Sequence, residues 1–124
     1  MSFESILRTI VDECGGGLGV ALVGSDGIPI AQAAPSQRPQ AFDADDMAAA
    51  GVEFGRILDE IRKVADALGG GAVGEAVVSL ARFTLVLRVV DADSFLVLAL
   101  SPDGNLGRAR YLVRRHLLAL REEM

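Results

Sequence analysis

Three short apolar runs in the second half of the chain, at residues 74–80, 84–90 and 94–100, limit the folds that it can adopt. Only three residues separate each run from the next. Such connections are too short for a crossover helix and are typical of antiparallel hairpins. Residues 85–87 and 95–100 are apolar at successive positions, so we expect these strands to be covered on both faces of a sheet. The sequence therefore predicts an antiparallel sheet between two layers of helices.

The first third of the chain predicts a helix followed by a β-hairpin. Apolar side chains recur at helical spacing from Phe3 to Cys14. Apolar runs at 19–23 and 28–33 flank an Asp26-Gly27 pair, which accepts the positive φ of a tight hairpin. Pro29 has no amide hydrogen to donate, so the second strand is expected at an edge of the sheet.

Two further helices complete the predicted order α-β-β-α-β-β-β-α. The second runs from Asp43, which can cap it, to about Leu68. The third spans roughly residues 105–122, and Asp103 or Gly104 can cap its start. Residues 34–42, which include two prolines, predict an exposed loop between the hairpin and the second helix.

Composition predicts a single soluble domain over residues 1–124. Half of the side chains are apolar (51%), which is enough for a sizeable core in 124 residues. No apolar run approaches the roughly 18 residues of a membrane span, and residues 2–14 lack the pattern of a signal peptide. A single cysteine excludes an internal disulfide. We therefore expect a cytoplasmic protein that does not contact a membrane.

Charge is distributed unevenly along the chain. The net charge is −5, and five of the twelve basic side chains follow residue 103. The acidic body argues against nucleic-acid binding, which needs a broad basic face. The arginine-rich last helix presents either an ordinary solvated face or a contact for something acidic. Eleven of the twelve basic residues are arginine, a bias typical of a GC-rich bacterial genome.

No constellation of residues predicts catalysis or cofactor binding. Gly69, Gly71 and Gly74 match the spacing of a dinucleotide motif, but they follow a helix and precede a strand, the reverse of the order that a phosphate site needs. His116 lies beside the apolar stripe of the last helix, and Cys14 ends the apolar stripe of the first. We therefore expect no enzyme, no metal site and no cofactor.

Taken together, these features resemble the Roadblock domain. The resemblance rests on the hairpin Val23–Ala31, on the start of the last helix at Asn105–Arg110, and on the element order over almost the whole chain. That family comprises dynein light-chain Roadblock proteins, Ragulator subunits and bacterial gliding-motility GTPase regulators. It implies an α+β fold, an α/β/α sandwich related to profilin. Its five-stranded antiparallel sheet has the strand order 2-1-5-4-3.

The predicted second helix has three kinds of surface. Its apolar stripe, expected to face the sheet, consists of Phe54, Ile57, Leu58, Ile61, Val64, Ala65 and Leu68. Charged residues fill another side, with Asp59–Lys63 and Arg62–Asp66 at ion-pair spacing. A third strip with almost no side-chain volume consists of Ala44, Ala48, Gly51 and Gly55. The strip permits close packing either on the chain's own sheet or on a helix of a second copy.

The resemblance implies a homodimer that pairs through the second helix and the third strand. The expected dimer contacts are Ala44, Ala48, Gly51, Gly55, Glu75, Val77 and Ser79. An apolar strand edge with one charged residue, Glu75, would otherwise be prone to aggregation.

The function that the resemblance implies is non-catalytic regulation of a small Ras-like GTPase, by activating or binding it. The candidate GTPase contacts are Glu53, Arg56, Asp59, Arg62 and Lys63. The alternative is a scaffold subunit of a signalling or motor complex that leaves GTP hydrolysis unchanged. A small-molecule sensor is a weaker third interpretation, because no polar constellation marks a pocket.

Overall fold

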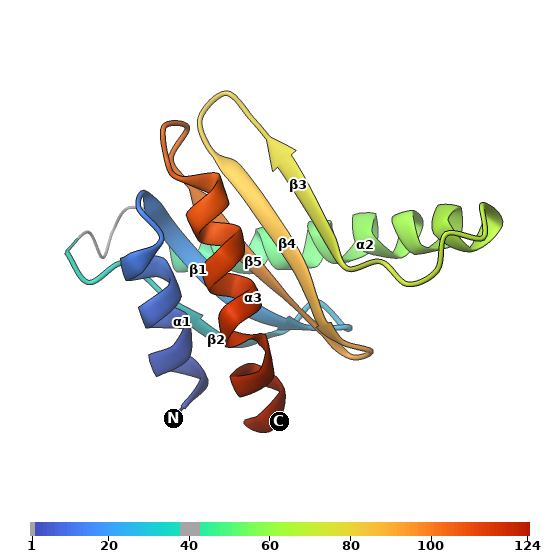
Figure 1. Cartoon of the computed structure of the whole chain (residues 1–124), viewed down its shortest axis with the longest axis horizontal. Helices are drawn as coiled ribbons and strands as arrows, with labels where there is room; N and C mark the ends of the chain where they lie inside the picture. Colours follow the sequence, from blue (N-terminus) through green and yellow to red (C-terminus); the bar gives the residue numbers. More distant parts are fainter. Residues whose placement is uncertain (1, 38–42) are drawn as a thin grey trace.

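A computed structural model describes residues 2–37 and 43–124, and in these ranges it contains three helices and five strands (Figure 1). In chain order they are α1 Phe3–Glu13, β1 Gly17–Gly24, β2 Pro29–Ala33, α2 Ala44–Ala67, β3 Glu75–Ser79, β4 Thr84–Asp91, β5 Ser94–Leu100 and α3 Leu106–Glu122. The strands form one sheet in the order β2-β1-β5-β4-β3, with every neighbouring pair antiparallel. The expected element order and strand order are both confirmed.

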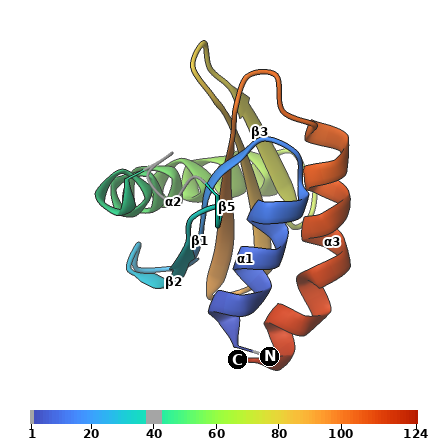
Figure 2. The ribbon, with the colours of Figure 1, turned by 90° about the vertical axis from the view of Figure 1, so that its left-hand side faces the viewer.

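The sheet lies between two layers of helices, as the doubly apolar strands predict. Helices α1 and α3 cover one face and α2 covers the other (Figure 2). The middle strand β5 is buried at all seven positions. Alternate β5 side chains point to opposite sides, so Leu98 packs with the α1 and α3 side chains and Phe95 with Leu58 of α2. Each fully buried leucine contributes about 2 kcal/mol to stability.

The two edges of the sheet are β2 and β3. Pro29 begins β2, where a missing amide hydrogen does little harm, so its expected edge position is confirmed. The hairpin before it turns at Gly27, whose φ is +83°. At residues 34–37 the chain returns towards α1, and Ser36 donates two hydrogen bonds to the Asp12 carboxylate, from its amide at 2.7 Å and its hydroxyl at 2.6 Å. The remainder of the predicted loop, residues 38–42, lies outside the described residues.

Side chains cap all three helices at their N-termini. Ser2 Oγ accepts the amide hydrogen of Ser5, and Asp43 Oδ1 accepts that of Asp45, so Asp43 caps α2 as predicted. The cap of α3 is Asn105, whose Oδ1 accepts the amide hydrogen of Arg108 at 3.0 Å. The expectation of Asp103 or Gly104 is therefore wrong: both belong to the preceding turn, which the Gly104 amide closes on the carbonyl of residue 101.

Candidate interaction surface

Only the first half of α2 rests on the sheet. A β-carbon on Gly51 would lie 3.1 Å from Val23 Cγ2, and one on Gly55 would lie 3.5 Å from the Phe95 ring. Leu58 closes this contact at 1% exposure. The two glycines therefore let the helix backbone approach the chain's own sheet.

For Gly51 and Gly55, this geometry favours packing on the chain's own sheet over a contact with a second helix. Gly51 is buried and Gly55 half-buried against the same chain, so the internal alternative describes both of them. Ala48 is half-buried, and only Ala44 is exposed, at the first position of the helix. A second molecule would therefore have to meet a different side of α2.

The second half of α2 extends past the edge of the sheet (Figure 1). Its apolar side chains are consequently uncovered: Ile57 is 45% exposed, Val64 57% and Leu68 79%. The expectation that the whole stripe faces the sheet is wrong for this half, because no strand lies beneath it. Ile57, Ile61 and Val64 instead line a shallow apolar groove of about 400 Å³ on the solvent side.

Charged residues of α2 form ion pairs with one another, and Glu53, Arg56 and Glu60 among them line the groove. The ion pairs join Arg56 to Glu53 at 3.8 Å, Arg62 to Asp59 at 3.0 Å and Lys63 to Glu60 at 2.9 Å. They replace the predicted Asp59–Lys63 and Arg62–Asp66 pairs, since each cation reaches three residues back instead of pairing across four. The hydrogen bond to Glu60 raises the pKa of Lys63. Exposed pairs of this kind stabilise a helix little, so their partners are easily exchanged in a complex.

The outer edge of β3 is the second part of the surface. Leu80 N donates to Phe83 O, and Val89 N donates to Gly74 O, so even-numbered β3 residues face β4 through their backbones. The alternate residues Glu75, Val77 and Ser79 therefore present their backbone N–H and C=O groups outward. In the described part of the chain no strand pairs with them. Val77 is 40% exposed.

A hollow joins this strand edge to α2. It has a volume of about 360 Å³ and is lined by Asp46, Ala50, Phe54, Leu80, Phe83 and Leu85. Leu80, directly after β3, is 44% exposed. The hollow thus connects the first half of α2 with the end of β3, and the second half of α2, which carries the apolar groove, extends past the same β3 edge of the sheet (Figure 1).

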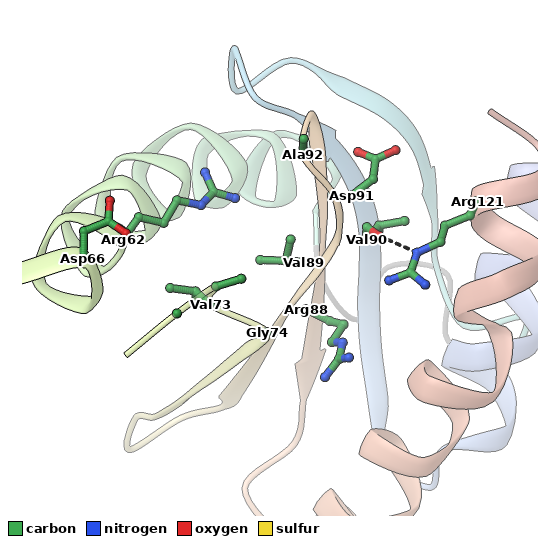
Figure 3. A pocket seen from close by; sticks show the side chains of 12 residues that line it. Arg62, Asp66, Val73, Gly74, Arg88, Val89, Val90, Asp91, Ala92 and Arg121 are labelled. Atoms are coloured by element: carbon green, nitrogen blue, oxygen red, sulfur yellow. Dashed lines mark hydrogen bonds between the residues drawn. The ribbon is translucent and has the colours of Figure 1, made fainter. Parts of the chain in front are cut away.

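A further cavity, of about 630 Å³, lies where β4 continues beyond β3 (Figure 3). Arg62, Arg88 and Arg121 line it together with Asp66 and Asp91. Their side chains do not converge: Arg62 extends from the α2 side of β4, whereas Arg121 lies on the α3 side and donates to the Val90 carbonyl at 2.6 Å. Charges of both signs spread around a rim do not select one small ligand.

His116 and Cys14, the basic and the nucleophilic side chain considered in the sequence, have structural roles. His116 Nδ1 lies 2.9 Å from the Leu112 carbonyl within α3. Cys14 is buried, and burial raises the pKa of its thiol, which disfavours the reactive thiolate. The described residues contain no cluster of three or more His, Cys, Asp or Glu that could hold a metal.

Comparison with known proteins supports the fold. No family model and no curated protein matches the chain. Among solved structures, MglC from Myxococcus xanthus is 34% identical over 100% of both chains, with a TM-score of 0.69. A Roadblock/LC7 domain from Streptomyces avermitilis has a TM-score of 0.85 at 15% identity, over 98% of this chain and 97% of that one. The gliding protein MglB from Thermus thermophilus has 0.83 at 18% identity, over 96% and 85%.

The described residues thus form a small α/β/α domain with an exposed apolar groove on α2 and an unpaired edge at β3. No helix in them has both the length and the apolarity that crossing a membrane requires. The chain belongs to the Roadblock/LC7 family, as its sequence similarity to MglC and its structural similarity to the Roadblock/LC7 domain show.

Proposed function

We propose that the protein is a homodimeric, non-catalytic regulator of a small Ras-like GTPase. The observation that carries the proposal is the apolar outer half of α2, which extends past the unpaired β3 edge of the sheet. Exposed apolar area next to an open strand edge is a contact surface or an aggregation hazard. The family relationship to the gliding protein MglB and to MglC supports a partner in a GTPase system.

In the proposed dimer, the β3 edges of two copies pair antiparallel across a two-fold axis. The outward backbone groups of Glu75, Val77 and Ser79 supply the hydrogen bonds, and the two sheets become one. The same axis brings the exposed ends of α2 together and removes Ile57, Val64 and Leu68 from water. A two-fold contact of this type is self-complementary, since each copy contributes the same patch.

The GTPase then contacts the charged side of α2. The residues proposed for this contact are Glu53, Arg56, Asp59, Arg62 and Lys63. Their mutual ion pairs are exposed and can be exchanged for contacts with the partner's switch segments. Stimulation of GTP hydrolysis would come from holding those switch segments in place. This mode of stimulation requires no free guanidinium on α2.

A scaffold without effect on hydrolysis is the second candidate. It is favoured by the fact that Arg56, Arg62 and Lys63 each already have a carboxylate partner on α2, so that none of the three is a free cation that could act on a nucleotide.

Single-turnover GTP hydrolysis by a Ras-like GTPase encoded in the same genome tests both candidates. We expect faster hydrolysis with the wild-type protein and loss of the effect in Arg56→Glu and Arg62→Glu. Ser5→Ala, in α1 on the opposite face, is the matched control. Binding without acceleration would support the scaffold, and no binding would contradict both.

A further inference from the structure

We propose that the outer face of α3 is a second docking surface, which binds an acidic amphipathic helix of a partner protein. The feature behind this proposal is a stripe along α3 formed by Gly107, Tyr111, Arg114 and Leu118. Their spacing of four, three and four residues places them in one line on a helix. All four are exposed, and this line lies opposite the side that packs on the sheet.

Two large side chains in this stripe are exposed to solvent and not packed in the core. Leu118 is 64% exposed and Tyr111 is 49% exposed. Arg115 Nη1 donates to the Tyr111 hydroxyl at 3.1 Å, which holds the ring in place before any partner arrives. A positioned tyrosine beside arginine is the composition of an interface hot spot. Next to them Gly107 leaves the backbone open, with only Asn105 Oδ1 within 4 Å of an added β-carbon.

The charges around the stripe are positive and uncompensated. Arg108, Arg114, Arg115 and Arg121 form no ion pair with a carboxylate among residues 2–37 and 43–124. Arg108 and Arg121 are instead anchored through Nε to the backbone carbonyls of Glu13 and Val90. Arg110 alone is neutralised, by Glu75. Glu122 is the acidic residue on this face, at its C-terminal end.

The chemistry of the occupant follows from this pattern. A line of two apolar side chains at helical spacing fits the ridge of another helix, and arginines without a carboxylate partner, in the stripe and beside it, call for carboxylates next to that ridge. The α2 helix of a second copy fits less well, because its carboxylates are already paired with its own cations. The apolar side of α3 is buried in the core, so the helix cannot insert into a lipid surface.

The α3 surface is separate from the proposed dimer and GTPase surface. Helices α2 and α3 lie on opposite faces of the sheet (Figure 2). A partner on α3 therefore leaves α2 and the β3 edge free, and one molecule can hold two partners at once.

A synthetic helical peptide is the probe for this surface. It has about 20 residues, the length of a helix of about 30 Å, with leucines at the spacing of the α3 stripe and glutamates on both flanks. A matched control replaces each leucine by serine and keeps the glutamates. A second control replaces each glutamate by glutamine. Fluorescence anisotropy measures binding to the whole protein, and backbone amide NMR shifts locate it.

We expect the acidic leucine peptide to bind and to shift amides of α3. Leu118→Ser and Arg114→Glu should each weaken binding by about tenfold, the loss typical of one interface anchor. Raising salt from about 0.05 M to about 0.5 M should weaken it further, because the Debye length shrinks. Ile57→Ser on α2 should leave binding unchanged. All of these positions are exposed, and an unaltered melting temperature confirms folding.

Several results would overturn the proposal. Equal binding of the serine control would show a charge effect without a helix-docking stripe, and NMR shifts on α2 would place the site elsewhere. Tighter binding of vesicles containing phosphatidylserine, or of single-stranded RNA, with the same dependence on Arg114 would identify a different partner class. Absence of binding by the leucine peptide would also refute it. Peptide binding by a monomeric variant would show that the α3 surface does not depend on the proposed dimer.

Discussion

Glu75 and Arg110 connect the edge strand to the last helix: Arg110 Nε lies 2.6 Å from Glu75 Oε1. Arg88 Nη1 lies 3.9 Å from the other oxygen of the same carboxylate. The Glu75 side chain is only 14% exposed, so it is the counter-ion for two cations in a partly dry site. Arg88 Nε is buried there without a hydrogen-bond partner. The first residue of β3 is thus tied to the strand beside it and to α3.

Replacing this carboxylate should destabilise the fold. In Glu75→Gln, two guanidinium groups lose their counter-ion, and we expect a loss of about 1–3 kcal/mol in the free energy of unfolding. Urea denaturation measures it. Glu53→Gln, which removes an exposed ion-pair partner, is the control and should change stability by less than about 0.5 kcal/mol. Equal losses of unfolding free energy in the two variants would show that the contacts of Glu75 with Arg88 and Arg110 do not stabilise the fold.

Gly51 should tolerate no large side chain. Gly51→Leu places three further carbons against Val23, where even a β-carbon is crowded, and we expect destabilisation by about 3 kcal/mol or more. Gly107→Ala is the matched helical control. It meets nothing closer than 3.7 Å, so its better helix propensity should stabilise the fold by up to about 1 kcal/mol. Thermal melts compare the two, and a stable Gly51→Leu monomer would contradict the observed packing.

Proline substitutions can separate the dimer from the fold. In Val77→Pro, the lost amide hydrogen is one that points away from β4, and the ring blocks an incoming strand. We expect a folded monomer by sedimentation velocity, whereas the wild type sediments as a dimer. Val78→Pro, one residue further, removes a β4 hydrogen bond and should cost about 3 kcal/mol in stability. A Val77→Pro protein that remains dimeric would contradict pairing through β3.

Acid should weaken the contact between Asp12 and Ser36. The hydroxyl hydrogen bond from Ser36, aided by its amide, holds the pKa of Asp12 below its ordinary value of 3.8. Because the folded-state pKa is depressed, this contribution is fully present above pH 3.8 and is lost as the pH falls through the lower folded-state value. Ser36→Ala should raise the pKa of Asp12 towards 3.8. Carboxyl NMR titration of both proteins measures it, and identical titration curves would contradict the role of the hydroxyl.

The sequence predicts the elements well because its signals are local. Pro29 marks an edge strand through its own missing amide, and Asp43 caps α2 through a carboxylate that reaches two residues ahead. The cap of α3 is missed by one residue, because Asn105, Asp103 and Gly104 are all residue types suited to caps. Only the turn that consumes Gly104 decides between them.

The candidate surface is less accessible to sequence reasoning. Periodicity shows that one side of α2 is apolar, but it does not show how far the sheet extends beneath it. Ile57 and Leu58 are adjacent and equally apolar, yet the first is 45% exposed and the second 1%. Likewise the small volume of Gly51 predicts a close neighbour, but it does not show whether that neighbour is Val23 or another molecule.

The position of β5 between β1 and β4 has a consequence for the order of folding. Strand β1 begins at residue 17, and its partner β5 begins at residue 94, so these neighbours are among the last to meet. During synthesis on the ribosome, the β1–β2 hairpin keeps one unpaired edge until most of the chain has emerged. Sheets closed by such distant pairings fold slowly for their size, and strands that are exposed before they pair are prone to aggregation.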